Sequence, residues 1–458
     1  MQHVHFIGIC GTAMGSVAAA MHAKGFKVTG SDENVYPPMS TFLEQQGIEI
    51  FPGYKAENIP ETAEIIVVGN AISRGNEEAE AALERKLLYV SLPEILKEHF
   101  LRGHRNLVVS GTHGKTTTSS MLAWLLKSAG VNPSYMIGGI PRNLGQGAAF
   151  TDSDFVVLEG DEYDTAFFDK RSKFLHYLPE VVVINNIEFD HADIYNSLDE
   201  IKLTFQRLLN IVPRNGMAFV NGDCANSMDV ASNTPAPVQT VGMGGHCDLQ
   251  ITDIDYGREQ TSFVIDGENY VLPMAGEFNV RNAAMAISAA RFSGFDADQI
   301  RQGLASFKGI ARRQEVRGIA GGVRVIDDFA HHPTAIGLAV DSLRQQYPDS
   351  RLWVIFEPRS NTTRRNVFQD ELAAALSKAD LAVVPAVPDP GKVAEEERLD
   401  PEKLVNDVKA AGTECWYRET VDDIVELVAS ESMEGDTVAV LSNGGFGGIH
   451  QKLLDRLA

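Results

Sequence analysis

The residues best suited to chemistry in this 458-residue sequence form one short segment, Gly111-Thr112-His113-Gly114-Lys115-Thr116. Its glycines let backbone N–H groups close around phosphate oxygens, and Lys115 supplies a positive charge to the outer phosphates. The Thr116 hydroxyl can ligate Mg²⁺. Val109 stands where the usual phosphate-binding loop has its first glycine. A plain strand-to-helix turn would not need Lys followed by Thr, so the segment predicts phosphate binding.

Two groups of carboxylates follow apolar, strand-like runs. The segment 159–164 follows the run 155–158, and the segment 186–191, which ends on Asp190-His191, follows the run 181–184. Carboxylates at the C-terminal ends of parallel strands lie where ligands bind in α/β sheets, and they can hold the metal that bridges nucleotide phosphates. A solvated acidic loop is the alternative for the first group. An imidazole suits Mn²⁺ better than Mg²⁺.

A second glycine-rich turn, Gly8 to Gly15, follows the first strand-like run, and Asp32 ends the next one. This arrangement is typical of a dinucleotide-binding unit, but Cys10 and Ala13 break the G-x-G-x-x-G spacing. A diphosphate or nucleotide at the helix N-terminus would explain the turn. A plain tight turn between strand and helix would explain it as well.

Two polar segments near the C-terminus also follow strand-like runs. Asp327 to Pro333 ends one run, and Phe356 to Thr362 ends the next. Both lie at C-terminal strand ends, which is the expected ligand edge of a parallel sheet. Ordinary turn chemistry around Pro333 and Pro358 is the alternative.

The elements that position these residues are strands alternating with helices, which predicts an α/β fold. Strands over 4–9, 27–29 and 65–68 and a helix over 16–23 give a Rossmann-like N-terminal domain, and the polar stretch 98–106 is typical of a linker. Strands over 106–109, 155–158 and 181–184 with a helix ending at Gly130 give a central P-loop ATPase domain, in which 236–273 suggests an antiparallel insertion. Strands over 323–326, 352–356, 381–384 and 437–441 with helices over 368–378 and 401–411 give a second doubly wound sheet.

Composition excludes several functions. The formal net charge is −22, and no Lys/Arg-rich run offsets it, so we expect no binding to nucleic acid or to an anionic membrane. The four cysteines are far apart and form no C-x-x-C pair, so neither a zinc site nor a disulfide framework is indicated, and a reducing cytoplasm fits. The N-terminus lacks a signal-peptide pattern, and no apolar stretch of about 18 residues occurs, so we expect no membrane span.

Five segments taken in order resemble the Mur ligase family: Gly111 to Thr116, Asp161-Glu162, Asn186 to His191, Gly276 to Asn282, and Asp327 to Pro333. The similarity covers nearly the whole chain. It implies three domains: 1–103 for the UDP-sugar, 104–312 for ATP, and a Rossmann-like 313–458 for the incoming amine or peptide. Cys10 and Ala13 replace family glycines near the sugar diphosphate, and Phe278 replaces a common His beside the adenine-binding Asn.

The resemblance also assigns roles to individual residues. It implies Lys115, Glu162 and His191 as catalytic residues, and a metal held by Thr116, Glu162 and His191. It implies that ATP contacts Gly111, Thr112, His113, Gly114, Lys115, Thr116, Thr117, Asn282, Arg313 and Asp328. The UDP-sugar is expected at Gly8, Gly11, Thr12, Met14, Asp32 and Ser73, and the peptide at His331, Arg359, Ser360 and Asn361.

Two stretches narrow the expected reaction. Asp161 to Arg171 and Glu357 to Thr362 resemble family members that join L-Ala-γ-D-Glu-meso-diaminopimelate to UDP-N-acetylmuramic acid in peptidoglycan recycling. The L-alanine-adding members usually carry His-Arg-Tyr-Thr-Arg after the proline, and UDP-N-acetylmuramate–L-alanine ligase activity is the alternative. The resemblance implies a cytoplasmic enzyme that uses ATP and Mg²⁺, or Mn²⁺, forms an acyl phosphate, and is a monomer or weak homo-oligomer.

Two functions from other classes compete with this interpretation. A nicotinamide-dependent oxidoreductase would use the first strand-helix-strand unit but would leave the Lys115 segment unexplained. A non-catalytic nucleotide switch would bind nucleotide tightly, but it would not need the two carboxylate groups.

Overall fold

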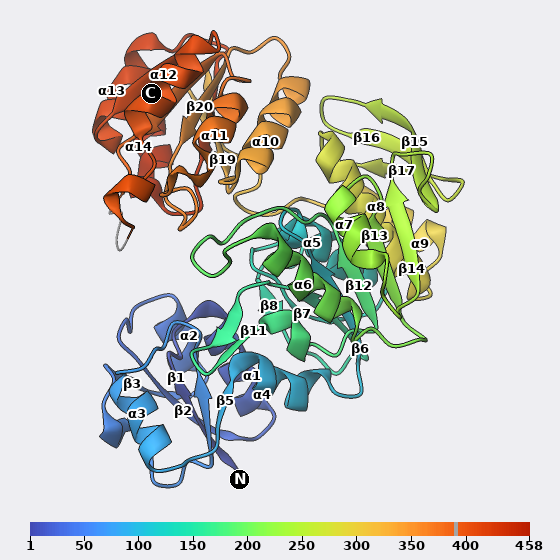
Figure 1. Cartoon of the computed structure of the whole chain (residues 1–458), viewed down its shortest axis with the longest axis vertical. Helices are drawn as coiled ribbons and strands as arrows, with labels where there is room; N and C mark the ends of the chain where they lie inside the picture. The colour runs from blue at the N-terminus through green and yellow to red at the C-terminus, as the bar shows by residue number, and fades with distance from the viewer. Residues whose placement is uncertain (389–392) are drawn as a thin grey trace.

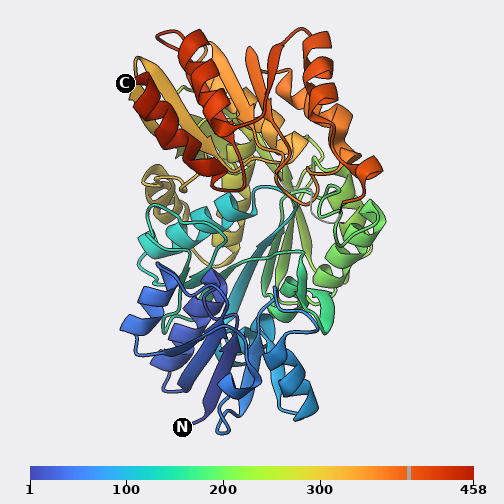
Figure 2. The same cartoon turned by 90° about the vertical axis from the view of Figure 1, so that its left-hand side faces the viewer.

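Three successive parts of the chain each form their own sheet with covering helices in the computed structural model, which describes residues 1–388 and 393–458. The N-terminal domain (blue) lies at one end, the C-terminal domain (orange to red) at the other, and the central domain between them (Figure 1). The view turned by 90° shows the same order of domains (Figure 2). The predicted α/β class with three domains is confirmed, while the boundaries near residues 103 and 312 stay predictions.

The N-terminal domain is a parallel sheet in the order β3-β2-β1-β4-β5. Its elements are β1 (His3–Ile7), α1 (Thr12–Ala23), β2 (Lys27–Asp32), α2 (Met39–Gln45), β3 (Glu49–Pro52), β4 (Ile65–Val68), α3 (Glu77–Glu84), β5 (Tyr89–Ser91) and α4 (Leu92–Leu96). Two predicted bounds were wrong: β1 ends before Gly8, whose φ is +86°, and α1 begins at Thr12. Gly8 permits this turn because it has no Cβ.

The expected linker 98–106 was wrong in its first half. Lys97–Leu101 forms a π-helix (η2) that continues directly from α4, and β6 begins at Arg105. The physical reason is burial, because Phe100 and Leu101 pack into the hydrophobic core. Only the short turn around Gly103 separates the helical segment from the central sheet.

The central domain is one large sheet in the order β17-β16-β15-β14-β13-β12-β6-β9-β7-β8. Its elements are β6 (Arg105–Ser110), α5 (Lys115–Ser128), β7 (Ser134–Met136), β8 (Ala148–Ala149), β9 (Phe155–Glu159), β10 (Asp164–Ala166), β11 (Asp169–Ser172), β12 (Val181–Ile184), α6 (Leu198–Leu209), β13 (Met217–Asn221), α7 (Ala225–Ala231), β14 (Val238–Gly242), β15 (Leu249–Tyr256), β16 (Thr261–Ile265), β17 (Glu268–Leu272), α8 (Glu277–Phe292) and α9 (Ala297–Ala305). The antiparallel insertion expected over 236–273 is confirmed for β15 to β17, but β14 pairs parallel with β13 inside the main sheet.

The C-terminal domain has the strand order β18-β19-β23-β20-β21-β22 among the described residues. Its elements are β18 (Glu315–Ala320), β19 (Val323–Asp328), α10 (Pro333–Gln346), β20 (Leu352–Phe356), α11 (Gln369–Leu376), β21 (Leu381–Pro385), α12 (Pro401–Ala410), β22 (Glu414–Arg418), α13 (Val421–Glu431), β23 (Thr437–Leu441) and α14 (Ile449–Leu457). All the pairs are parallel except β18 with β19, an antiparallel edge that the sequence did not predict.

Strand pairing explains why the polar segments meet. β6 pairs in parallel with β9 on one side and β12 on the other, so the segments that follow these three strands leave the sheet at one edge. In the C-terminal domain, β23 lies between β19 and β20 and gathers the segments after all three in the same way. Within residues 1–388 and 393–458, no helix is both long and apolar enough to cross a membrane.

Candidate active site

The first turn of α5, at the end of the glycine-rich loop, presents free backbone N–H groups. Gly111 and Gly114 adopt φ of +126° and +81°, and the first hydrogen bond of α5 runs from Thr118 N to Gly114 O at 2.9 Å. The N–H groups of the first helical turn therefore have no partner within the helix. Asn186 shapes the loop, since its backbone oxygen accepts from Thr112 N at 3.0 Å and its Oδ1 accepts from His113 N at 2.8 Å. The result is an anion-binding helix N-terminus.

Position 114 requires a glycine because of the side chains next to it as well as because of its positive φ. A Cβ at this position would lie 2.3 Å from Asn282 Oδ1 and 2.8 Å from Asn185 Nδ2. Asn282 Nδ2 and Asn185 Oδ1 are buried without a hydrogen-bond partner among the described residues. This pair of asparagines thus packs directly behind the phosphate loop, where the sequence predicted a nucleotide contact for Asn282.

We expect Gly114→Ala to weaken ATP binding at least about tenfold, because the strained φ and the displaced asparagine each cost roughly 1–3 kcal/mol. Calorimetric titration of ATP measures this change. Gly130→Ala is the matched control, since Gly130 also has a positive φ of +92° but open space around it. Equal losses of affinity in the two variants would contradict a specific role for Gly114.

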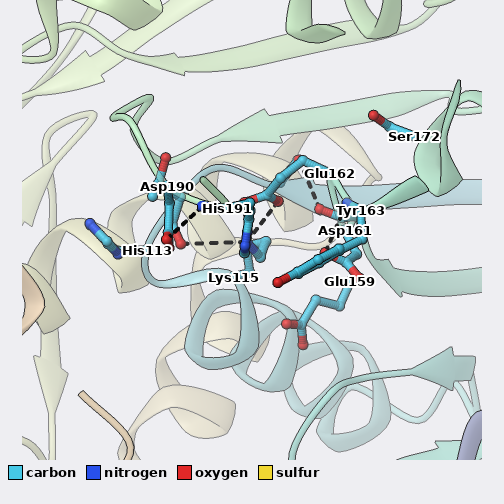
Figure 3. Close-up of polar contacts among 12 residues, drawn as sticks. His113, Lys115, Glu159, Asp161, Glu162, Tyr163, Ser172, Asp190 and His191 are labelled. Atoms are coloured by element: carbon cyan, nitrogen blue, oxygen red, sulfur yellow. Dashed lines mark hydrogen bonds and ion pairs between the residues drawn. The ribbon is translucent and has the colours of Figure 1, made fainter. Parts of the chain in front are cut away.

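Lys115, Glu162 and His191 form a cluster at the edge of the sheet, in which Glu162 is buried and the other two are half-buried (Figure 3). Lys115 Nζ lies 2.8 Å from Glu162 Oε2, and His191 Nε2 lies 3.0 Å from Glu162 Oε1. Burial alone would lower the pKa of Lys115, but attraction to Glu162 and Asp161 outweighs it and raises the pKa. The structure therefore brings together all three residues that the sequence predicted to be catalytic, and Lys115 carries its charge.

The donor set around this cluster fits a magnesium-class ion. Ligand atoms of Asp161, Glu162 and His191 lie within 4.8 Å of one another. The Thr116 hydroxyl, predicted as a metal ligand, donates to Glu159 Oε1 at 3.0 Å. Oxygen donors with few nitrogens are what Mg²⁺ and Mn²⁺ prefer.

Glu159 belongs to the predicted carboxylate group 159–164, but the sequence reasoning gave it no individual role. Its Oε2 accepts from Gly138 N at 2.7 Å, and its Oε1 accepts from Thr116. Burial raises the pKa of Glu159, although the Gly138 N–H and the charge of Lys115 oppose the rise. Its place as the last residue of β9, beside the phosphate loop, was the one signal that could have identified it.

A cavity of about 710 Å³ opens between the central and C-terminal domains above this cluster. Most residues predicted to bind ATP or peptide line it: Thr112, His113, Gly114, Lys115, Thr116, Thr117, Arg313, Asp328, His331, Arg359, Ser360 and Asn361, together with His191. Gly111, Asn282 and Glu162 do not line the cavity. Asn282 packs against Gly114, and Glu162 pairs with Lys115, and both of these partners do line it. The volume suits a nucleotide and part of a second substrate.

Contacts across the cavity join the two domains. Asn361 Nδ2 donates to Asp193 Oδ2 at 2.8 Å, and Thr362 Oγ1 donates to Asp190 Oδ1 at 2.8 Å. Ser360 instead bonds within its own turn, to Thr363. The loop after β20 therefore reaches the loop of the central domain that carries His191, which puts the predicted peptide and phosphate sites in one cavity.

Arg359 owes its place to a glycine that the sequence reasoning missed. A Cβ on Gly444 would lie 1.7 Å from an Arg359 guanidinium nitrogen, so only glycine lets that side chain pass. The neighbouring Asn443 lines the cavity, and its Oδ1 is buried without a partner among the described residues. Neither feature has a local sequence signal, because β20 and β23 are brought together only by the fold.

The predicted UDP-sugar residues lie around the N-terminus of α1. Asp32 Oδ2 accepts from Cys10 N at 2.9 Å, which holds the turn, and Gly11 is the N-cap of α1 with Thr12 as its first residue. Met14 is 6% exposed, and its side chain packs in the hydrophobic core. Ser73 is exposed in the loop after β4. Ile72, the residue before Ser73, lies close to Gly8, because a Cβ on Gly8 would lie 3.7 Å from its side chain.

The hairpin β10–β11 reaches from the central domain to the N-terminal domain. Its Phe168 ring packs edge-on against Tyr89, with centroids 4.9 Å apart. Asp169 accepts from Arg171 at 2.7 Å and lies 3.0 Å from His176 Nε2. The hydrogen bond from Arg171 lowers the pKa of Asp169 to about 2. This hairpin thus contacts the N-terminal domain at β5.

Because the pKa of Asp169 is lower in the folded protein than its ordinary value of 3.8, the ionised carboxylate stabilises the fold above about pH 3.8. This stabilisation is lost as the pH falls toward about 2. We therefore expect Asp169→Asn to lower the melting temperature at pH 7, with the difference from wild type shrinking between pH 5 and pH 3. Thermal melting at several pH values measures it. Asp164→Asn, in the same hairpin beside the exposed Lys170, is the control and should change less. A pH-independent difference would contradict the assignment.

The fold and this site define a class of protein, and family models identify it. The model for the Mur ligase family catalytic domain matches residues 3–104, that for the Mur ligase middle domain matches 109–290, and that for the Mur ligase glutamate ligase domain matches 312–444. The chain belongs to the Mur ligase family.

The chain is also similar to individual proteins of this family. The chain is 42% identical to UDP-N-acetylmuramate–L-alanyl-gamma-D-glutamyl-meso-2,6-diaminoheptandioate ligase of Escherichia coli, over 100% of this chain and 98% of that one. It is 32% identical to UDP-N-acetylmuramate–L-alanine ligase of a Psychrobacter species, over 99% and 95%. The crystal structure of a murein peptide ligase from Psychrobacter arcticus superposes with a TM-score of 0.73 at 36% identity, covering 100% and 99% of the two chains.

Proposed function

We propose that this protein uses ATP to join the amine of L-Ala-γ-D-Glu-meso-diaminopimelate to the carboxylate of UDP-N-acetylmuramic acid, in cytoplasmic peptidoglycan recycling. The observation that carries the proposal is full-length identity of 42% to a ligase named for that tripeptide, against 32% for a ligase named for L-alanine. Arg359, Ser360 and Asn361 line the cavity beside the phosphate loop, which supports their role as peptide-binding residues. We expect a monomer or a weak homo-oligomer.

The first step proposed is phosphoryl transfer. The carboxylate oxygen of UDP-N-acetylmuramic acid attacks the γ-phosphorus of ATP, and the bond from that phosphorus to the β-phosphate oxygen breaks. The products of this step are ADP and an acyl phosphate. Lys115 and the free N–H groups of the loop would neutralise charge on the transferred phosphoryl group. In the second step the peptide nitrogen attacks the acyl carbon, phosphate leaves, and the amine loses its proton.

A divalent metal would fit the oxygen-rich donors beside the loop. Thr116, Glu162 and His191 are the proposed ligands, and the proximity of Glu159 to Thr116 adds a further carboxylate. The ion would add positive charge next to the phosphates. Lys115, which now pairs with Glu162, is held within reach of the same place by that carboxylate.

An isotope experiment tests the chemistry of this proposal. UDP-N-acetylmuramic acid labelled with ¹⁸O in its carboxylate is incubated with ATP and the tripeptide, and the released phosphate is analysed by mass spectrometry. An acyl phosphate transfers one labelled oxygen to phosphate, because the C–O bond to that oxygen breaks in the second step. Amide product with unlabelled phosphate would contradict the mechanism, and the absence of amide product would contradict the function.

A further inference from the structure

Three side chains meet at the joint between the central and C-terminal domains, and His113 among them is also a predicted ATP contact. They are the imidazole of His113 in the phosphate loop, the carboxylate of Glu188 after β12, and the imidazole of His332 at the N-cap of α10. Glu188 Oε2 lies 3.2 Å from His113 Nε2 and 3.6 Å from His332 Nδ1. One donor atom from each residue lies within 4.8 Å of the other two.

The two separations from Glu188 Oε2 match those of donors around a tetrahedral ion. Zn²⁺ bonds of about 2.0–2.1 Å at tetrahedral angles place neighbouring donors roughly 3.3 Å apart. Both distances from Glu188 Oε2 lie within about 0.3 Å of that value. Two imidazoles and one carboxylate, with a fourth position left for water, are also a donor set that zinc takes in proteins. Mg²⁺ prefers sites made of oxygen.

The surroundings already orient the donor atoms. His332 Nε2 lies 3.1 Å from Phe189 O, so the ring donates there and keeps its Nδ1 lone pair toward Glu188. Thr334 N donates to that Nδ1 at 3.3 Å and Thr334 Oγ1 donates to Glu188 Oε2 at 2.7 Å, and an ion bound to Nδ1 would replace the first of these hydrogen bonds. Burial and the nearby His113 lower the pKa of His332 to about 4, which keeps the ring neutral, as a metal ligand must be.

We propose that His113, Glu188 and His332 form a second metal site, for an ion of the Zn²⁺ class, distinct from the oxygen-rich Asp161-Glu162-His191 cluster. His113 and Glu188 belong to the central domain and His332 to the C-terminal domain. A bound ion therefore ties the N-terminus of α10 to the phosphate loop. Separation of the two domains would break the bond to His332, so an occupied site holds the cavity between them closed.

Cobalt titration of the full-length, chelator-stripped protein tests the site without nucleotide or peptide, so its result does not depend on the proposed ligase activity. Tetrahedral Co²⁺ absorbs visible light far more strongly than octahedral Co²⁺. We expect intense absorption that saturates at one equivalent, is abolished by Zn²⁺, and persists in an excess of Mg²⁺. Absence of the tetrahedral spectrum in the wild-type protein would overturn the proposal.

Variants assign the signal to the three residues. Glu188→Gln and His332→Ala should each weaken Co²⁺ binding at least about 100-fold, since even outer-shell changes weaken metal sites by 10–100-fold. Thr334→Val is the matched control at the same joint and should keep or tighten binding, because its hydroxyl competes for Glu188 Oε2. His191→Ala should leave the signal unchanged. Loss of the signal in His191→Ala, or its persistence in both Glu188→Gln and His332→Ala, would contradict the assignment.

Discussion

Replacing Lys115 with Ala is expected to lower the rate of ATP-dependent amide formation by about 100-fold or more, which is the scale of losing one charge contact to a transition state. The Nζ of Lys115 is the positive charge beside the free N–H groups of the phosphate loop, and Glu162 holds it there at 2.8 Å. Steady-state phosphate release with saturating substrates measures the effect on kcat.

Folding must be separated from catalysis in this experiment. Removing Lys115 leaves the buried Glu162 carboxylate with His191 as its remaining side-chain partner, so the melting temperature of the variant has to be recorded as well. Lys202→Ala, at a surface ion pair with Asp229, is the matched control and should retain wild-type kcat. A folded Lys115→Ala protein with near-normal turnover would show that this side chain does not stabilise the transferred phosphoryl group.

Replacing Arg359 with Ala is expected to reduce kcat/KM for the tripeptide at least about 30-fold, because loss of one partner of a charge-assisted pair costs 2–5 kcal/mol. A guanidinium fork matches a carboxylate in two parallel hydrogen bonds, and the tripeptide offers several carboxylates. Arg359 lines the cavity and is given room there by Gly444. Initial rates at varied tripeptide concentration measure the change.

Two further variants sharpen the test. Arg359→Lys should recover part of the loss, since a lysine supplies the charge without the fork. Arg344→Ala, at a surface pair with Asp380 on the same domain, should leave kcat/KM unchanged. If Arg359→Ala changed the KM for ATP and not that for the tripeptide, the residue would belong to the nucleotide site instead.

Much of the central site was predictable because its residues follow strands that are apolar on both faces. Such strands pair in parallel, and parallel pairing of β6, β9 and β12 brings the segments after them to one edge regardless of loop detail. Lys115, Glu162 and His191 could therefore be grouped from the sequence, and the structure places Glu162 within 3.0 Å of each of the other two.

The contacts that sequence reasoning missed are tertiary ones without a local pattern. Asn186 holds the phosphate loop from the end of another strand, and Gly444 makes room for Arg359 from a distant loop. Glu159 ends β9 and starts the predicted carboxylate group, but the contact of its carboxylate with Thr116 has no signal in the sequence. The contact of Asn361 with Asp193 depends on how two domains dock, which no spacing within either domain encodes.

The most direct test of the proposed function compares two amines in one assay. ATP-dependent phosphate release is measured with UDP-N-acetylmuramic acid and either L-Ala-γ-D-Glu-meso-diaminopimelate or L-alanine. The expected result is phosphate release with the tripeptide and little release with L-alanine. This result would support Arg359 and Asn361 as peptide-binding residues. Release with L-alanine alone would contradict the proposed function and would make the protein an L-alanine-adding member of the family.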